Sequence, residues 1–469
     1  MCNVTAAALK SPGATVRVDG LLRIRCAARA VAGALLAGFA LAWGAPAWSV
    51  LPIQTWQTQS GAKVLFVRAD SIPMIDIQID FDAGDRLSPP GRQGLASMVN
   101  ALLAKGTGEL DEAAIAERFA LAGALRGGGA GDDGASVSLR SLVSEPQLDQ
   151  AVALLAALLA RPAFPAAVLE REQQRVIAGL RESATRPETI VRRTFDALLY
   201  GTHPYGQHPE PETVAAIRRE DLVGFHANHY SAQRSVVSMI GAVSRERAAQ
   251  IAEALTRELP AGVAAPARLP LPMPAAGAER RIAHPASQSH ILVGMPGIAR
   301  GDPDFFALTV GNYVLGGGGF VSRLYAEVRD RRGLAYSVYS YFSPQKQAGP
   351  FAIGLQTRKD QADQALTVVR ETLDRFLREG PTEEELAAAK SNLIGGFALR
   401  IDSNAKILAQ LAAIGFYDLP LDWLERWTER VGAVSVADVR AAFARHVRAE
   451  TLATVVVGAP QGATGSPGR

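Results

Sequence analysis

The stretch that decides the fold is Gly94–Thr107, which reads GLASMVNALLAKGT. Small and apolar residues surround three positions, Ser97, Asn100 and Ala101. Ser97 and Ala101 are four residues apart, and this spacing places two side chains on one face of a helix. A strand ending in residues 82–86 (DAGDR) and a Pro-Gly turn precede this helix. Alanine cannot bind a metal, asparagine is no base at neutral pH, and serine is a poor zinc ligand. The sequence therefore predicts a helix that lacks zinc-binding chemistry at these three positions.

Two related halves are indicated by identities that recur at a constant offset of 217 residues. Tyr200 then coincides with Tyr417, and His229 coincides with His446. The other coincident pairs are Leu169 with Leu386, Ile177 with Ile394, Gly179 with Gly396, Asp221 with Asp438, and Gly241-Ala242 with Gly458-Ala459. Because the period has the size of a domain, we interpret it as a tandem duplication and not as a solenoid repeat.

Each half is expected to be α+β, with α-helices packed on a mixed β-sheet. Alternating apolar residues predict strands over Ile75–Phe81 and Phe351–Leu355, and helical spacing predicts helices over Leu148–Leu159 and Gln361–Leu377. The segment Leu259–Gly277 is rich in proline and alanine and is predicted to be a linker. The predicted organisation is a first domain at residues 48–258, the linker at 259–277, a second domain at 278–460 and a disordered tail at 461–469.

The first 47 residues are predicted to be an export signal. Arginines at 23, 25 and 29 precede the uncharged run Ala30–Trp43, which is followed by a small-residue site, GAPA. This order is typical of a cleaved secretory signal peptide, and the apolar run is shorter than the roughly twenty residues that cross a bilayer. We therefore expect residues 1–47 to be removed and the protein to be periplasmic or otherwise exported, without stable membrane insertion. An uncleaved membrane anchor is the alternative.

Charge and cysteine content exclude two classes of function for the mature chain. The whole chain has 49 basic and 46 acidic residues, and residues 1–47 contain five of the basic and one of the acidic residues, which leaves 44 basic and 45 acidic. A near-neutral chain lacks the basic footprint of a nucleic-acid-binding protein. Both cysteines, Cys2 and Cys26, lie in the predicted signal. The mature chain is therefore expected to have no disulfide and no thiol nucleophile or thiol ligand.

The strand, turn and helix at residues 82–107 and the tandem halves resemble the M16 peptidases, the inverted-zincin relatives of pitrilysin and insulinase. The resemblance covers most of residues 51–460. In active members the helix reads GLAHxxEH, in which two histidines bind zinc and the glutamate acts as general base. Ser97, Asn100 and Ala101 stand at these three positions. The resemblance thus implies an M16 fold with a degenerate zinc motif and no metal or other cofactor in this chain.

Other candidate ligands form no convincing zinc site. The resemblance places the third family ligand, a glutamate, in the region of Glu170 and Glu172, which we interpret as a solvated helix face. His226 and His229 have helical spacing. However, His229 recurs as His446 in the second half, where a phenylalanine replaces His226. Structural contacts are therefore the favoured interpretation, and a zinc site elsewhere in the chain is the disfavoured alternative.

The second half keeps a longer pattern, LGGGGFVSRLYAEVRDRRGLAY, at residues 315–336. Its four glycines permit close backbone approach, but the GK[ST] ending of a phosphate-binding loop is absent, so a turn between helices explains them. The resemblance implies that Arg329 and Tyr336 bind the substrate backbone and stabilise the oxyanion. A guanidinium and a phenol are both hydrogen-bond donors suited to a carbonyl oxygen. A helix-end ion pair and a packed strand tyrosine are the alternative interpretation of these two residues.

The resemblance implies a zinc-less partner subunit of an exported M16-like metallopeptidase, because one branch of the family divides its site between two subunits. A partner bearing the HxxEH helix would hold zinc, and this chain would close a heterodimer's chamber and contribute Arg329 and Tyr336. The chain alone is expected to be inactive. A non-enzymatic peptide-binding or scaffold protein is the alternative, and autonomous peptidase activity has no supporting motif. The peptide substrate and the choice between heterodimer and homodimer stay open.

Overall fold

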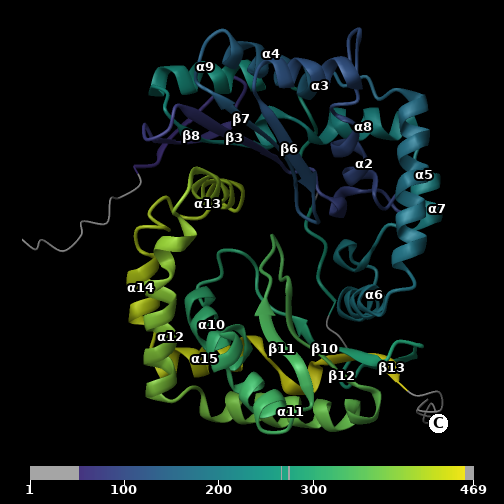
Figure 1. Cartoon of the computed structure of the whole chain (residues 1–469), viewed down its shortest axis with the longest axis vertical. Helices are drawn as coiled ribbons and strands as arrows, with labels where there is room; N and C mark the ends of the chain where they lie inside the picture. The colour runs from purple at the N-terminus through teal and green to yellow at the C-terminus, as the bar shows by residue number, and fades with distance from the viewer. Residues whose placement is uncertain (1–51, 266, 273–274, 460–469) are drawn as a thin grey trace, which may run out of the picture. The chain divides into compact units, whose positions relative to one another are not determined.

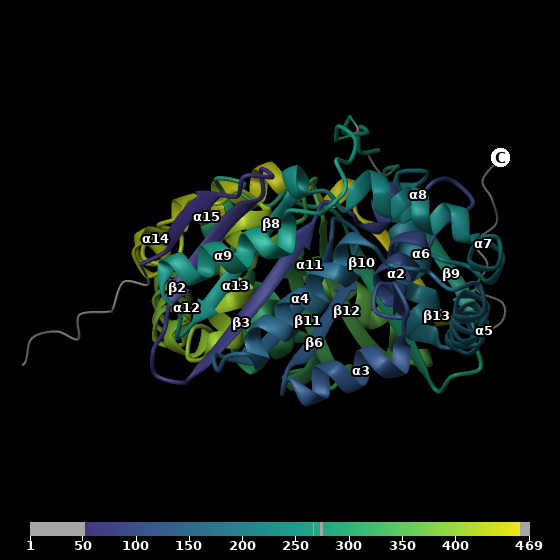
Figure 2. The ribbon, with the colours of Figure 1, turned by 90° about the horizontal axis from the view of Figure 1, so that it is seen from above.

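The computed structural model describes residues 52–265, 267–272 and 275–459, which form two large β-sheets covered by helices (Figure 1; Figure 2). A small two-stranded sheet pairs β4 (Gly106–Thr107) with β5 (Leu110–Asp111). The predicted signal peptide at residues 1–47 and the predicted tail at 461–469 lie outside the described residues. Among the residues that the structure describes, no helix has the length and apolarity that a membrane span requires.

The first sheet has six strands in the order β1-β2-β8-β3-β7-β6. Its centre is β3 (Met74–Phe81), which pairs antiparallel with β8 (Ser235–Gly241) and with β7 (Ala135–Leu142). β2 (Lys63–Arg68) runs parallel to β8. The two outer strands are β1 (Gln54–Gln57) and β6 (Leu125–Ala130).

Apolar alternation along β3 builds the core of the first half. Ile75, Ile77, Ile79 and Phe81 are fully buried and point to one face of the sheet. Because side chains alternate across a strand, the intervening positions face the opposite side. The helices of the first half are α2 (Leu95–Leu102), α3 (Glu112–Leu121), α4 (Gln147–Ala160), α5 (Ala166–Ser183), α6 (Pro187–Tyr200), α7 (Pro211–Ala215), α8 (Arg219–His229) and α9 (Arg245–Thr256).

The second sheet has five strands in the order β11-β12-β10-β13-β9. β10 (Gln288–Pro296) pairs antiparallel with β12 (Pro350–Arg358) and β13 (Ala453–Ala459), and β9 (Glu279–Ala283) runs parallel to β13. The edge opposite β9 is β11 (Ala335–Phe342). The helices of the second half are α10 (Phe305–Asn312), α11 (Ala362–Glu379), α12 (Glu383–Gly395), α13 (Asn404–Phe416), α14 (Trp427–Ala433) and α15 (Val436–His446).

The two halves share one plan. Five strands of the first sheet, β2-β8-β3-β7-β6, have counterparts in the order β9-β13-β10-β12-β11. The offset of 217 residues also relates α8 to α15, which end at His229 and His446. The predicted α+β fold of two tandem related domains is therefore confirmed.

Equivalent helices are exchanged between the halves. α6 belongs to the first half in sequence but packs on β10 and β13 of the second sheet, where Phe195 and Leu199 join Val455 in one apolar cluster. α13 belongs to the second half but packs on β2, β3 and β8 of the first sheet, where Leu411 meets Ile240 (Figure 1). Each sheet therefore has one face that is covered by a helix from the other half.

Candidate functional site

At the three degenerate positions on α2, one side chain is buried in the folded structure and two are exposed. Asn100 is buried, and its Nδ2 donates a 3.0 Å hydrogen bond to the backbone oxygen of Ser136 on β7. Ser97 and Ala101 are exposed. Ser97 donates its hydroxyl to Asp85 Oδ2 at 3.0 Å. Asn100 has thus become a structural link between α2 and the sheet, and Ala101 has no ligand atom.

The glutamates of α5 are also unsuited to a metal. Glu170 is exposed, as predicted, but the solvated face predicted for Glu172 is wrong, because this side chain is buried. Its carboxylate accepts hydrogen bonds from Arg175 Nε at 2.7 Å and from Arg171 Nη2 at 3.2 Å. Burial would raise the pKa of Glu172, but these two guanidinium groups hold it below its usual value. The residues present at the family's metal positions therefore do not fit zinc.

The histidines make structural contacts, in agreement with the prediction. His226 Nε2 lies 2.8 Å from the backbone oxygen of Leu159, and its ring stacks on a tyrosine. His229 lies 3.4 Å from Arg234 Nη1. Among the described residues, one triad has ligand atoms close enough for a cation, Asp302, Asp304 and His446. The Arg445 guanidinium already pairs with both oxygens of Asp304, at 2.7 and 2.8 Å, and so neutralises the charge of that carboxylate.

Arg329 and Tyr336 come together in the second half. Arg329 lies on η6 (Tyr325–Asp330), a π-helical turn, and Tyr336 is the second residue of β11. The register of β11 against β12 shifts at Tyr336, which forms a β-bulge. Bulges redirect a side chain out of the regular alternation. The carbon of the Arg329 guanidinium lies 5.2 Å from the centre of the Tyr336 ring, which is 81% exposed.

Two further aromatic rings surround Arg329, and the sequence analysis missed both. The guanidinium carbon lies 4.6 Å from the ring centre of Tyr325 and 5.8 Å from that of Phe320. Cation–π contacts of this kind orient a guanidinium without using its N–H donors. One signal was available, because Tyr325 stands four residues before Arg329, the spacing that places two residues on one helix face. Phe320 carried no such signal.

These residues line an open pocket of about 430 Å³ beside β11. The glycine-rich segment forms one wall of this pocket. The turn predicted at the four glycines begins later than expected, because residues 316 and 317 still belong to η4 (Tyr313–Gly317). A side chain at Gly316 would lie 2.5 Å from Ser340 Oγ, so the glycine permits this turn to pack against the strand. Gly319 adopts a positive φ of 62°.

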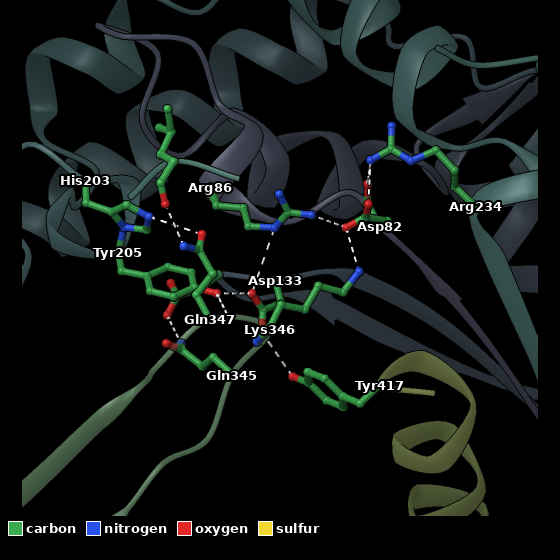
Figure 3. Close-up of polar contacts among 12 residues, drawn as sticks. Asp82, Arg86, Asp133, His203, Tyr205, Arg234, Gln345, Lys346, Gln347 and Tyr417 are labelled. Carbon is green, nitrogen blue, oxygen red and sulfur yellow. Dashed lines mark hydrogen bonds and ion pairs between the residues drawn. The ribbon is translucent and has the colours of Figure 1, made fainter. Parts of the chain in front are cut away.

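The turn after β11 is tied to the first half by a polar network (Figure 3). Lys346 Nζ lies 2.9 Å from Asp82 Oδ1, and the backbone nitrogen of Lys346 donates to Asp133 Oδ2 at 2.7 Å. Arg86 and Arg234 also pair with Asp82. Burial would raise the pKa of Asp82, but hydrogen bonds from Arg234 and Lys346 and the charge of Arg86 hold it well below its usual range. The strand that carries Tyr336 therefore has a fixed anchor in the first half.

Hydroxyl groups from both halves complete this network. Tyr205, from the first half, and Tyr417, which follows α13, both donate to the carboxylate of Asp133 (Figure 3). Gln345 Nε2 donates to Asp132 Oδ2 at 2.6 Å. The site as a whole offers hydrogen-bond donors and aromatic surface from the second half, and the described part of the first half contributes no metal-binding set. This arrangement can bind a peptide carbonyl, but it has no base or nucleophile of its own at Arg329 and Tyr336.

Two family models match the chain, Insulinase (Peptidase family M16) over residues 63–210 and Peptidase M16 inactive domain over residues 216–393. The crystal structure of a peptidase M16 inactive domain from Pseudomonas fluorescens has 38% sequence identity and a TM-score of 0.84, and the alignment covers 87% of this chain and 98% of that one. An uncharacterized zinc protease of Streptomyces coelicolor is 30% identical over 58% of this chain and 61% of its own length. The periplasmic protease PqqL from Escherichia coli has the same fold at 16% identity, with a TM-score of 0.75 over 87% of this chain and 45% of that one.

Proposed function

Because the chain belongs to peptidase family M16, we propose that it is the zinc-less partner subunit of an exported metallopeptidase. The observation that carries this proposal is the contrast between the two halves. Ser97, Asn100 and Ala101 cannot hold zinc, whereas Arg329 and Tyr336 converge in an open pocket. In this proposal a second M16 chain with an intact HxxEH helix brings the metal and the general base, and this chain closes the chamber.

The role of this chain is to bind and orient the peptide. The Arg329 guanidinium and the Tyr336 hydroxyl donate hydrogen bonds to the oxygen of the reacting carbonyl, where negative charge develops. In the described residues both donors are free for this task. The contacts of the Arg329 guanidinium are to aromatic ring faces, and the Tyr336 side chain is exposed. The three rings hold the guanidinium in place before the peptide arrives, which reduces the entropy lost in the reaction.

Location in the periplasm or another exported compartment is part of the same proposal. Residues 1–47 have the pattern of a signal peptide. The periplasmic protease PqqL from Escherichia coli has the same fold as this chain, which supports an exported location. N-terminal sequencing of the exported protein tests this part, because a protein that begins at Met1 would contradict cleavage.

Peptide cleavage by a candidate HxxEH-bearing chain, with and without the mature form of this chain, tests the function. We expect activity in the mixture that neither chain has alone. Arg329→Ala and Tyr336→Phe should each lower turnover by about 10²-fold, the usual cost of removing one oxyanion donor, without loss of assembly. Arg118→Ala is the control, because Arg118 is exposed and has no ion pair among the described residues.

The opposite outcome favours the second candidate, a non-enzymatic peptide-binding or scaffold protein. A partner that is equally active alone, and that does not bind this chain, would contradict the subunit role. Unchanged turnover in both variants of a working complex would contradict the roles of Arg329 and Tyr336 while leaving the subunit role intact.

A further inference from the structure

A second pocket lies between α6 and the second sheet, next to the pocket of Arg329. Its volume is about 670 Å³. α6 contributes Glu188, Arg192 and Arg193, and the two pockets share Ser337 and Tyr339 of β11. The helix reaches this place only because it is exchanged between the halves. The pocket therefore combines side chains of the first half with the strand that carries Tyr336.

The floor of the pocket is a row of polar side chains across the sheet. Gln356 of β12 stands opposite Ser337 of β11 and opposite His290 of β10. Neighbouring strands are about 4.8 Å apart, so this row is about 10 Å long. No hydrogen-bond partner for these three side chains is found among the described residues, although all three line the pocket. The floor can therefore donate hydrogen bonds to a ligand.

The walls carry an unpaired positive charge at Arg192. Arg192 is exposed and has no carboxylate partner in the described part of the chain. The Arg193 guanidinium donates to the backbone oxygen of Pro209, so its charge is also uncompensated by that contact. Glu188 is the carboxylate among the lining residues. Glu188 and the Asp196 carboxylate beside His208 offset two positive charges in number, so the feature that favours an anion is the unpaired guanidinium of Arg192.

Two histidines also line the pocket. Burial lowers the pKa of His290, so its ring is neutral near pH 7 and can still donate one hydrogen bond. His208 Nε2 lies 3.1 Å from Asp196 Oδ2, so this carboxylate stands beside the ring. The pocket is therefore suited to an anionic group that also accepts hydrogen bonds.

The position of the pocket relates it to the carbonyl site. Tyr336 and Tyr339 are three residues apart on β11, a distance of about 10 Å along a strand. The ring of Tyr339 lies next to Gly354, where a side chain would come within 2.6 Å of it, and it stacks on Tyr341 with 6.0 Å between ring centres. A peptide held at Tyr336 can therefore extend over these rings and reach the basic walls within about three residues.

We propose that this pocket binds a carboxylate of the peptide, from an acidic side chain or from the free C-terminus. Arg192 is the charged donor, and Gln356 and Ser337 donate further hydrogen bonds. This inference rests on the proposed function, because it takes a peptide at Arg329 and Tyr336 as its starting point. It assigns the substrate class: peptides with a carboxylate close to the reacting bond.

Fluorescence anisotropy with labelled peptides and the mature chain tests the assignment without any partner. Three peptides of one sequence are compared: one with an internal glutamate and an amidated C-terminus, one with glutamine and a free C-terminus, and one with glutamine and an amide. We expect the charged peptide that the pocket selects to bind at least about tenfold more tightly than the neutral one, as one charge-assisted contact allows. The first two peptides distinguish the side chain from the C-terminus as the source of the carboxylate.

Arg192→Gln should abolish that preference and leave the affinity for the neutral peptide unchanged. Arg181→Gln removes an exposed positive charge from α5 and is the matched control, which should keep the preference. Gln356→Ala, an exposed strand position, should weaken the preference less. Thermal melting of each variant verifies that it folds.

The outcomes separate this inference from the proposed function. If Arg192→Gln binds all three peptides like the unmodified chain while Arg329→Ala weakens all of them, the basic pocket is refuted and the peptide-binding role stands. Equal affinity of the unmodified chain for the three peptides also refutes the pocket. If none of the peptides binds the chain, both this inference and the peptide-binding role at Arg329 and Tyr336 are overturned.

Discussion

Tyr200 and Tyr417 are equivalent residues of the two halves, and each donates its hydroxyl to a hairpin turn of the opposite half. Tyr200 donates to the backbone oxygen of Ala348 at 3.1 Å, and Tyr417 donates to Asp133 Oδ2 at 3.2 Å. Each tyrosine stands at or next to the end of an exchanged helix. The two turns also contact each other through Lys346 and Asp133. The exchange of helices thus links both sheets through one polar centre.

Asp82→Asn should strongly destabilise the fold. The Asp82 side chain is 13% exposed and compensates Arg86, Arg234 and Lys346. Without the carboxylate these cations lie together in a poorly solvated site, and we expect a loss of about 3–5 kcal/mol, seen as a lower urea midpoint and Tm. Asp418→Asn is the control, because Asp418 pairs with Lys63 at 2.9 Å but is 84% exposed, and its loss should stay below about 1 kcal/mol. Equal losses in the two variants would refute the importance of burial here.

Asn100→Ala should lower stability by about 1–3 kcal/mol, the cost of an unpaired buried polar group. The Asn100 amide bonds the backbone oxygen of Ser136 and lies 3.5 Å from the hydroxyl of the fully buried Tyr230. Ser97→Ala, one turn earlier on the exposed face, should change stability by less than about 0.5 kcal/mol. Thermal melts of the two variants provide the measurement. An unchanged Tm for Asn100→Ala would show that the asparagine does not serve the fold.

Asp80→Asn should stabilise the protein at pH 7.5 but not at pH 4. Burial raises the pKa of Asp80 to about 6, and a hydrogen bond from Gln78 offsets only part of this rise. The folded protein therefore keeps this proton up to about pH 6, whereas the unfolded chain releases it near pH 4. Stability is lost as pH rises between these values, by at most about 3 kcal/mol. The neutral amide of Asp80→Asn removes this loss of stability at pH 7.5. A gain in Tm that is the same at pH 7.5 and pH 4 would contradict the raised pKa of Asp80.

Phe320→Ala should lower the turnover of the proposed complex several-fold without changing the Tm of this chain. Phe320 is 77% exposed, so its removal costs little folding energy, but its ring helps to hold the Arg329 guanidinium. Val321→Ala is the matched control, since Val321 is 73% exposed and follows Phe320 directly. The comparison of kcat and KM for the two variants measures the effect. Equal kinetics would mean that Arg329 needs no support from this ring.

Much of the fold could be predicted from the sequence because it depends on local periodicity. The predicted strand at Ile75–Phe81 is β3 with one further residue at its start, and the predicted helix at Leu148–Leu159 is α4 with one more residue at each end. Alternation of buried side chains and helical spacing are properties of neighbouring residues, so they can be read without knowledge of the fold. The repeat at 217 residues likewise needed only comparison of the chain with itself.

The candidate site was less accessible from the sequence. Arg329 and Tyr336 were predicted through a resemblance, but Phe320 and Tyr325 were missed, and Glu172 was wrongly placed on a solvated face. The burial of Glu172 depends on how α5 lies against its neighbours, which periodicity alone does not reveal. The apolar moment of a helix indicates that it has a buried face but not which residues cover it.

The sequence by itself determined the α+β character, the duplication and the absence of zinc ligands on α2, because each follows from residue type at a given spacing. Only the tertiary structure decided that α6 and α13 exchange sheets, that Lys346 meets Asp82, and that Arg192 stands beside the strand of Tyr336. These contacts join residues that are about a hundred or more positions apart. Their geometry is set by the packing of two sheets on each other's helices, and no local pattern encodes it.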